Sequence, residues 1–346
     1  MTISTASQPA SRSGGRPARP GVRRLTGFKP TGHLQLGNLI GAIRPIVAGQ
    51  YRTETIVFLA DLHALTVPHE PARVRSLTLE QATTLLAAGL DPDRALVYVQ
   101  SHVPAHTELH YLLECATGYG EAHRMIQFRE KSSTQRQQSR LSLLTYPVLM
   151  AADILLHGAE EVPVGEDQRQ HVELTRDVAI RFNTRYGQTF PVPRAVHPEV
   201  AARVMDLTAP TRKMGKSADS PAGTIYVLDP PEAIRRKVSR AVTDPGRTVE
   251  YDPQRRPGVA NLLDILAACL STTPAELAGD YHSYARLKEA VTEALDAMLR
   301  PIRLRHAELT RDPGYVRRVL ADGAERARES TADTVYRVKR ALGLLP

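Results

Sequence analysis

Two short segments carry residue types suited to binding phosphate. Residues 25–42, LTGFKPTGHLQLGNLIGA, predict a short strand, a loop broken by glycine and proline, and a helix that begins near Gly37. Such a loop presents free backbone N–H groups and the positive end of a helix dipole, which together bind phosphate. In residues 211–217, TRKMGKS, Lys213 and Lys216 flank a glycine, so both cations could reach a polyphosphate. Taken alone, each segment is equally consistent with an ordinary turn or a solvated basic loop.

A carboxylate within an apolar helix indicates a second kind of site. The expected helix Leu143–His157 is largely apolar, and within it Tyr146, Met150 and Asp153 share one face because they lie four and three residues apart. A buried carboxylate is costly unless a donor meets it. Either an arginine pairs with Asp153, or Asp153 receives an N–H group of a ligand while Met150 and Tyr146 form pocket walls.

A third group of polar residues lies in the segment 162–168, VPVGEDQ, where a short strand is expected to enter a helix that runs to about Phe182. Glu166 and Asp167 could complement the dipole of this helix. Gln168, in the same turn, could instead meet the α-amino group of an amino acid. These residues leave both interpretations open.

Strands and helices alternate in the first part of the chain. Residues 55–60 form an apolar run typical of a buried parallel strand, and His63 lies just beyond its end. Further strands are expected over 95–99 and 203–207, with helices over 71–89 and 107–117. This order implies an α/β fold with a Rossmann-like, doubly wound parallel sheet, which binds ligands at the carboxyl ends of its strands.

The second part of the chain predicts helices only, over residues 231–242, 261–270, 274–281, 284–310 and 313–342, with a kink at Pro301. A chain of 346 residues is long enough for two domains. We therefore expect a tail over residues 1–22, a Rossmann-like domain over 23–225 and an all-helical domain over 226–346.

The basic charge is concentrated near the N-terminus. The formal charge is +8, yet residues 1–53 hold eight Lys or Arg and no acid, so the remainder balances. Residues 1–22 are rich in Ser, Pro, Gly and Arg and are expected to be disordered. This tail is either solvated or a weak contact to a phosphate backbone.

Composition also bears on compartment. No run of about 18 apolar residues occurs, so no membrane span is expected. Cys115 and Cys269 lie in apolar helical stretches and are expected in the core, without a disulfide or a structural metal. We therefore expect a cytoplasmic protein.

Six motifs in this order resemble those of class I aminoacyl-tRNA synthetases, and specifically the bacterial tryptophanyl-tRNA synthetases. They are PTGHLQLGN at 30–38 (the HIGH-type signature), DLHALT at 61–66, MIQFREKS at 125–132, LLTYPVLMAADILL at 143–156, VPVGEDQRQHVELTRD at 162–177 and KMGKS at 213–217 (the KMSKS-type signature). PGVANLL at 257–263 also fits. The resemblance extends from about Leu25 to the C-terminus.

The resemblance implies a reaction in two steps. The carboxylate of tryptophan attacks the α-phosphate of ATP, which enters with Mg²⁺, and tryptophanyl-adenylate and pyrophosphate form. The 3′-terminal adenosine of tRNA(Trp) then takes the acyl group. Positioning and charge stabilisation carry the rate of such a reaction. The family also implies a homodimer and a helical domain, residues 226–346, that recognises the tRNA anticodon.

The resemblance assigns roles to individual residues. The implied catalytic set is Lys213, Lys216, Lys131, Gln35 and Asn38, in which the lysines stabilise charge on the leaving pyrophosphate. ATP binding is implied for Lys29, Pro30, Thr31, Gly37, Asn38, Gly165, Glu166, Asp167, Val204, Lys213, Met214, Gly215, Lys216 and Ser217. Tryptophan binding is implied for Asp153, which would accept the indole N–H, and for Met150, Tyr146, Gln168, His63, Gln127 and Leu25.

Four residues depart from the family pattern. Gln35 stands where the HIGH-type signature has His or Thr, and Gly215 stands where the mobile loop has serine. Leu25 stands where many relatives have phenylalanine, and Lys29 where many have glutamine. These departures predict an altered affinity for ATP or tryptophan, or tolerance of an inhibitor that mimics indole.

Two alternatives remain at this stage. One is a tyrosine–tRNA ligase of similar fold, and the other is a non-catalytic RNA-binding paralogue. Asp153 and the GEDQ segment favour tryptophan. Gln35 and Gly215 favour the paralogue, whereas the presence of Lys213 and Lys216 argues against it.

Overall fold

The computed structural model describes residues 21–125, 140–165, 168–196, 204–215, 221–246 and 248–345. Within them, parallel strands form one five-stranded sheet in the order β3-β2-β1-β4-β5. The strands are β1 Arg23–Phe28, β2 Glu54–Leu59, β3 Leu96–Val99, β4 Glu161–Pro163 and β5 Arg194–Val196. Because strand order reverses direction at β1, the carboxyl edge of the sheet has a crevice there, where such folds bind ligands. The expected doubly wound sheet is confirmed.

The sheet is covered by apolar side chains on both faces. Val57 and Leu59 of β2 pack into one cluster with Ile40, whereas Ile56 and Phe58 pack into another. Successive strand residues point to opposite faces, so an uninterrupted apolar strand requires cover on both sides. The first cluster continues through α4 Pro71–Ala87 and α11 Pro257–Leu270 to α13 Tyr284–Arg311.

The expected helices form, with ends that differ by a few residues. A continuous helical segment comprises α1 Leu36–Asn38, a π-helical turn Leu39–Ile43 and α2 Arg44–Gly49. The remaining helices near the sheet are α3 Asp61–Ala64, η2 Gln100–His102, α5 Ala105–Glu114, α6 Tyr119–Arg124, α8 Leu141–Leu156 and α9 Arg169–Tyr186. Those that follow are η4 Pro221–Gly223, α10 Pro231–Ser239, α12 Pro274–Ala278 and α14 Pro313–Ala341.

The expected strand over residues 203–207 is wrong. In the described part of this segment, Met205 forms only an isolated antiparallel bridge with Lys213, and Met214 N donates to the carbonyl of Val204 at 3.0 Å. The segment therefore folds back on itself as a two-stranded arm and does not join the sheet. The strand at this edge of the sheet is β5, which is three residues long and was not expected.

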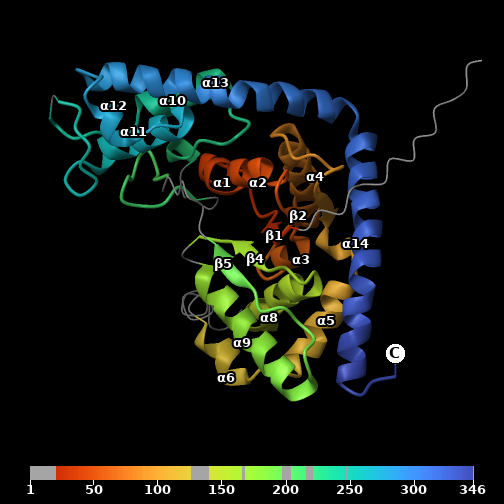
Figure 1. The fold of residues 1–346 in the computed structure, drawn as a ribbon. Helices are drawn as coiled ribbons and strands as arrows, with labels where there is room; N and C mark the ends of the chain where they lie inside the picture. The colour runs from red at the N-terminus through yellow and green to blue at the C-terminus, as the bar shows by residue number, and fades with distance from the viewer. Residues whose placement is uncertain are drawn as a thin grey trace, which may run out of the picture.

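The last helix returns to the sheet. Figure 1 shows α13 running past α4 and α14 turning to descend along the side of the sheet. A Cβ on Gly323 of α14 would lie 1.8 Å from the carbonyl oxygen of Val97 in β3, so only glycine permits this approach. Helix α13 continues through Pro301. The division of the chain at residue 225 stays a prediction.

The two cysteines correct one expectation. Cys115 is exposed, so it is not a core residue, and Cys269 is half-buried. Burial raises the pKa of the Cys269 thiol to about 12. None of the helices that the structure describes is both long and apolar enough to cross a membrane.

Candidate active site

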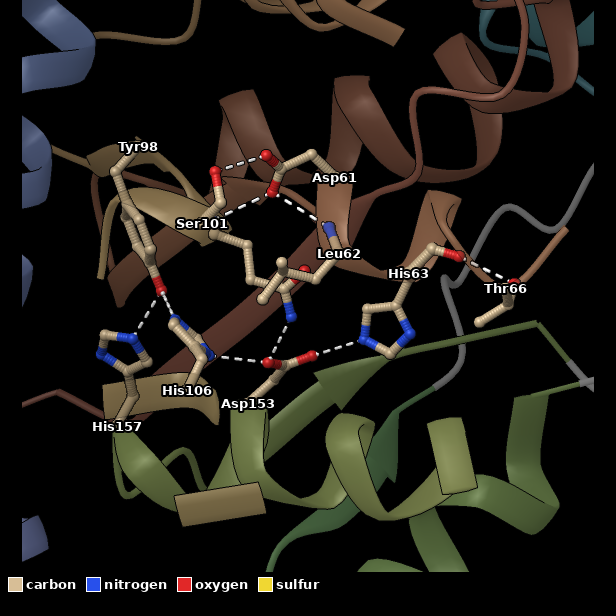
Figure 2. Close-up of polar contacts among 10 residues, drawn as sticks. Asp61, Leu62, His63, Thr66, Tyr98, Ser101, His106, Asp153 and His157 are labelled. Carbon is tan, nitrogen blue, oxygen red and sulfur yellow. Dashed lines mark hydrogen bonds and ion pairs between the residues drawn. The ribbon is translucent and has the colours of Figure 1, made fainter. Parts of the chain in front are cut away.

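Asp153 of α8 lies at the carboxyl edge of the sheet and is only 1% exposed. Its Oδ2 accepts a hydrogen bond from His63 Nε2 at 2.7 Å. Its Oδ1 accepts from His106 Nδ1 at 2.7 Å and from Gln100 Nε2 at 2.6 Å, as Figure 2 shows for the two histidines. Burial raises the pKa of Asp153, but the hydrogen bonds from His106 and His63 lower it to about 2. The group is therefore ionised at neutral pH.

The donors come from the elements that follow neighbouring strands. His63 lies on α3 after β2, Gln100 directly follows β3, and His106 opens α5. Among the described residues the donors to Asp153 are two histidines and a glutamine, and no described arginine pairs with it. Contact of Asp153 with an N–H group of a ligand stays a prediction. Gln100 and His106 were not identified from the sequence. His63 was noted because it lies just beyond the end of a strand, and Gln100 also lies just beyond the end of a strand.

The carboxylate of Asp153 retains acceptor capacity on one oxygen. An ionised carboxylate offers about four lone-pair positions. Among the residues that the structure describes, two donors meet Oδ1 and one meets Oδ2. One further N–H group therefore fits the hydrogen-bonding capacity of Oδ2.

The structure describes most of the other residues expected at the amino-acid pocket. The ring of Tyr146 lies edge-on to that of His63, with centroids 6.3 Å apart, and its hydroxyl is 2.9 Å from Nε2 of His171 in α9. Leu25 belongs to the buried apolar cluster against which Met150 packs. Gln168 is the N-cap residue of α9. The structure thus brings Asp153, His63 and Tyr146 together and places Leu25 with Met150.

The two phosphate-type loops are joined by Gln35. Its Oε1 accepts from Gly37 N at 2.6 Å, and its backbone N–H donates to Asn38 Oδ1 at 3.1 Å, which completes an N-terminal capping box. Its Nε2 donates to the carbonyl oxygen of Met214 at 3.0 Å. Both polar atoms of this side chain make a hydrogen bond within the protein, so Gln35 holds the two loops together. Its catalytic role stays a prediction.

The lysine-rich arm is anchored by apolar side chains. Met214 is 1% exposed and lies in the cluster that contains Leu36 and Ile225, and Val204 is buried in the same cluster. Their side chains are thus engaged in core packing, and their contact with ATP stays a prediction. Lys213 is exposed at the isolated bridge with Met205.

Lys29 connects the first loop to the pocket. Its Nζ donates to Thr66 Oγ1 at 3.0 Å, and Thr66 Oγ1 donates to the carbonyl of His63 at 2.8 Å. Pro30 and Thr31 line a cavity of about 170 Å³ together with residues that follow His63. A substitution of Lys29 would therefore alter contacts both in the loop at residues 30–38 and beside His63.

Several expected site residues lie outside the described residues. They are Gln127, Lys131, Glu166, Asp167, Lys216 and Ser217. Gly165 is described and exposed at the end of the segment that follows β4. Among the described residues, no group of three or more His, Cys, Asp or Glu side chains could hold a metal ion.

The family profile for class I tRNA synthetases of tryptophan and tyrosine, described as "tRNA synthetases class I (W and Y)", matches residues 19–300. Tryptophan–tRNA ligase 1 of Streptomyces coelicolor is 59% identical over 329 residues, which cover 94% of this chain and 98% of that protein. The chain belongs to the bacterial class I tryptophanyl-tRNA synthetases.

Solved structures of this synthetase family agree over nearly the whole chain. Tryptophanyl-tRNA synthetase from Mycoplasma pneumoniae aligns with a TM-score of 0.86 and 35% identity, covering 94% of this chain and 98% of that one. The synthetase from Campylobacter jejuni, complexed with ADP and tryptophan, aligns with a TM-score of 0.81 and 30% identity, covering 93% and 100%. The helical region of the chain therefore belongs to the synthetase fold as much as the sheet does.

Replacement of Gln35 by alanine should affect both the helix and the loop of this synthetase. Loss of the cap should cost about 0.5–2 kcal/mol in the free energy of unfolding. Loss of the bond to Met214 should lower kcat/KM for ATP roughly 2- to 13-fold in pyrophosphate exchange, the equivalent of one neutral hydrogen bond.

Thr273→Ala is the matched control for Gln35→Ala. Thr273 also caps a helix through a capping box, but it lies at the start of α12, away from both loops. We expect a similar loss of stability without a change in ATP kinetics. If both variants show the same kinetics, the link between Gln35 and the loop has no functional role.

The ionised state of Asp153 predicts sensitivity to acid. Its pKa in the folded state, about 2, lies below the ordinary value of 3.8, so the unfolded chain binds the proton more readily. The contribution of ionised Asp153 to the free energy of unfolding is complete above about pH 4 and is lost as pH falls toward about 2. Urea unfolding midpoints should therefore fall more steeply with acid in the wild type than in Asp153→Asn. Equal slopes would contradict the assignment of the charge.

Proposed function

We propose that the chain ligates tryptophan to tRNA(Trp) in two steps. The tryptophan carboxylate oxygen bonds to the α-phosphorus of ATP while the bond from that phosphorus to the pyrophosphate oxygen breaks. The acyl group of the resulting adenylate then passes to the 3′-terminal adenosine of the tRNA, and AMP leaves. The observation that carries this proposal is the buried, ionised Asp153, whose Oδ2 has an acceptor position left for one N–H group.

Asp153 supplies selectivity for the indole ring. A charged acceptor facing an N–H donor in a dry pocket stabilises the complex by about 1.5–3 kcal/mol. A ring without a donor would leave the acceptor position unused and would gain none of this energy. The edge-on contact of Tyr146 with His63 and the apolar cluster of Leu25 and Met150 support a flat, aromatic substrate beside the carboxylate.

The two joined loops supply the site for ATP. We assign the phosphates to the loop at residues 30–38 and to Lys213 and Lys216, with Lys131 as a third cation. Gly165, Glu166 and Asp167 are assigned to the ribose and adenine. Mg²⁺ enters with ATP as its counter-ion, and the lysines offset charge on the departing pyrophosphate.

The finer assignments rest on family membership. We propose that the helical region, residues 226–346, recognises the anticodon and that two copies of the chain form the working enzyme in the cytoplasm. Within its basic run on α10, Lys237 pairs with Asp229 at 2.6 Å and lies over the ring of Tyr226. Arg235 and Arg236 are exposed. Lys237 is therefore part of the fold, and the exposed arginines are the better candidates for RNA.

A non-catalytic paralogue is the second candidate, supported by Gln35 and Gly215. Gln35 retains a defined role in the capping box and in the bond to Met214. These bonds from Gln35 favour the enzyme over the paralogue.

Tryptophan-dependent exchange of labelled pyrophosphate into ATP tests the proposal. The wild type should catalyse exchange with tryptophan, and Asp153→Ala should raise KM for tryptophan roughly 13- to 160-fold, the equivalent of a charged hydrogen bond. Exchange that is indifferent to tryptophan would exclude the assigned substrate. Absence of adenylate formation with all amino acids would favour the paralogue.

Glu161→Gln is the matched control for Asp153→Ala. Glu161 is also a buried carboxylate with a pKa that burial raises and that Arg24 and Arg194 lower, but it lies on β4 away from the pocket. This variant should lose stability and keep the KM for tryptophan.

Serine at position 215 should restore a hydrogen bond of the mobile loop. A Cβ on Gly215 would meet only the carbonyl oxygen of Lys213, at 3.8 Å, so the side chain fits. We expect Gly215→Ser to raise the exchange rate roughly 2- to 13-fold, with stability within about 0.5 kcal/mol of the wild type. Gly215→Ala adds Cβ without a hydroxyl and should stay near the wild-type rate. Equal gains in both variants would attribute the effect to backbone stiffness.

A further inference from the structure

A chain of buried polar groups lies behind Asp153, on the side away from His63. Tyr98 of β3 places its hydroxyl 2.9 Å from Nε2 of His106 and 2.6 Å from Nε2 of His157. Tyr98 and His106 have no exposed surface, and His157 is 4% exposed. Figure 2 shows the contacts running from His157 to the Tyr98 hydroxyl, from there to His106, and from His106 to the carboxylate. His157 follows α8, the helix that carries Asp153.

The positions of the protons in these hydrogen bonds follow from the chemistry of the groups. A carboxylate only accepts, so the nitrogen of His106 that faces Asp153, Nδ1, must carry hydrogen. The Tyr98 hydroxyl has one proton and meets two histidine nitrogens, so one nitrogen accepts that proton and the other donates its own.

Two arrangements satisfy these conditions. With neutral His106, Tyr98 donates to His106 Nε2 and accepts from His157 Nε2. With protonated His106, its Nε2 donates to Tyr98, and Tyr98 donates to His157. In both arrangements His106 Nδ1–H still donates to Asp153.

The surrounding groups keep Tyr98 and His157 uncharged. Burial, and after it the Asp153 charge, raises the pKa of Tyr98 well above its usual range. Burial, His106 and Arg23 lower the pKa of His157, and Asp153 opposes them. Arg23 also donates to the carbonyl of His157 at 2.6 Å, which fixes that residue at the end of α8.

We propose that Tyr98 and His157 are positioning residues that hold His106 as a donor to Asp153 and thereby set the preference for an amino acid with an indole N–H. This inference rests on the proposed function. Loss of the Tyr98 hydroxyl would leave His106 Nε2 without a partner in a buried position, so the imidazole would no longer be held in one orientation. The carboxylate would then lose one of the two donors on Oδ1 that orient Oδ2, and Gln100 alone would remain there.

The experiment compares two amino acids that differ in the ring donor. Dissociation constants are measured for tryptophan and for benzothienylalanine, in which sulfur replaces the ring N–H. In Tyr98→Phe we expect the preference for tryptophan to fall roughly 2- to 13-fold, with the affinity for the analogue unchanged. An unchanged preference would overturn the inference.

A double variant separates positioning from stability. Tyr98→Phe orphans His157 as well as His106, and Tyr98→Phe combined with His157→Phe removes one of these two orphaned groups. We expect the double variant to recover part of the lost Tm and to keep the reduced preference. If the double variant recovered the preference for tryptophan together with Tm, the role of Tyr98 would be structural only. Should Tyr98→Phe alone fail to fold, the double variant carries the comparison with the wild type.

Phe190→Leu is the matched control. Phe190 is a buried aromatic residue that packs on Phe182, with ring centroids 5.0 Å apart. It is not part of the hydrogen-bonded series of Tyr98, His106 and His157. It should lower Tm and leave the preference unchanged, and a reduced preference would show that any loss of stability has this effect. A wild type without tryptophan-dependent exchange would refute the proposed function itself. A wild type with exchange, and a Tyr98→Phe variant with unaltered preference, would refute only the inference.

Discussion

The negative charge of Asp153 is the constraint on which the arrangement of the site depends. A carboxylate that is 1% exposed must be met by donors, because an uncompensated buried charge is strongly destabilising. Its donors come from the segments after β2 and β3 and from the start of α5, so these segments must converge on one point of α8. In the proposed function the same hydrogen bonds that stabilise this part of the fold also orient the carboxylate toward the amino acid.

A second set of contacts unites the two ends of the site. Gln35 bonds the arm that carries Lys213 through the carbonyl of Met214, and Lys29 reaches Thr66 beside His63. The departures from the family pattern at Gln35 and Lys29 are thus accommodated by bonds within the protein. These hydrogen bonds connect the loop at residues 30–38 both with the arm that carries Lys213 and with the segment beside His63.

The sequence predicted those features that depend on neighbouring residues, such as strands, helix starts and the cost of a buried charge. Apolar residues located β2 and β3, and prolines mark the first residue of α4, α10, α11, α12 and α14, where the missing N–H is harmless. The cost of a buried charge singled out Asp153. Its partners could not be predicted, because Gln100 and His106 lie 53 and 47 residues away and only the folded sheet brings them near. The segment 203–207 has the composition of a strand, and only its tertiary contacts show that it pairs with itself.

The contact of Gly323 with β3 has a consequence for biosynthesis. Tyr98 shares its buried cluster with Ala324 and Ala327 of α14, so the C-terminal helix forms part of the wall behind the strand that holds Tyr98. Domains fold as their residues leave the ribosome, N-terminal segments first. A nascent chain that ends before residue 313 therefore has β3 without this cover. In the inference above, Tyr98 positions a donor to Asp153, so a product truncated before α14 would lack the helix that covers this strand.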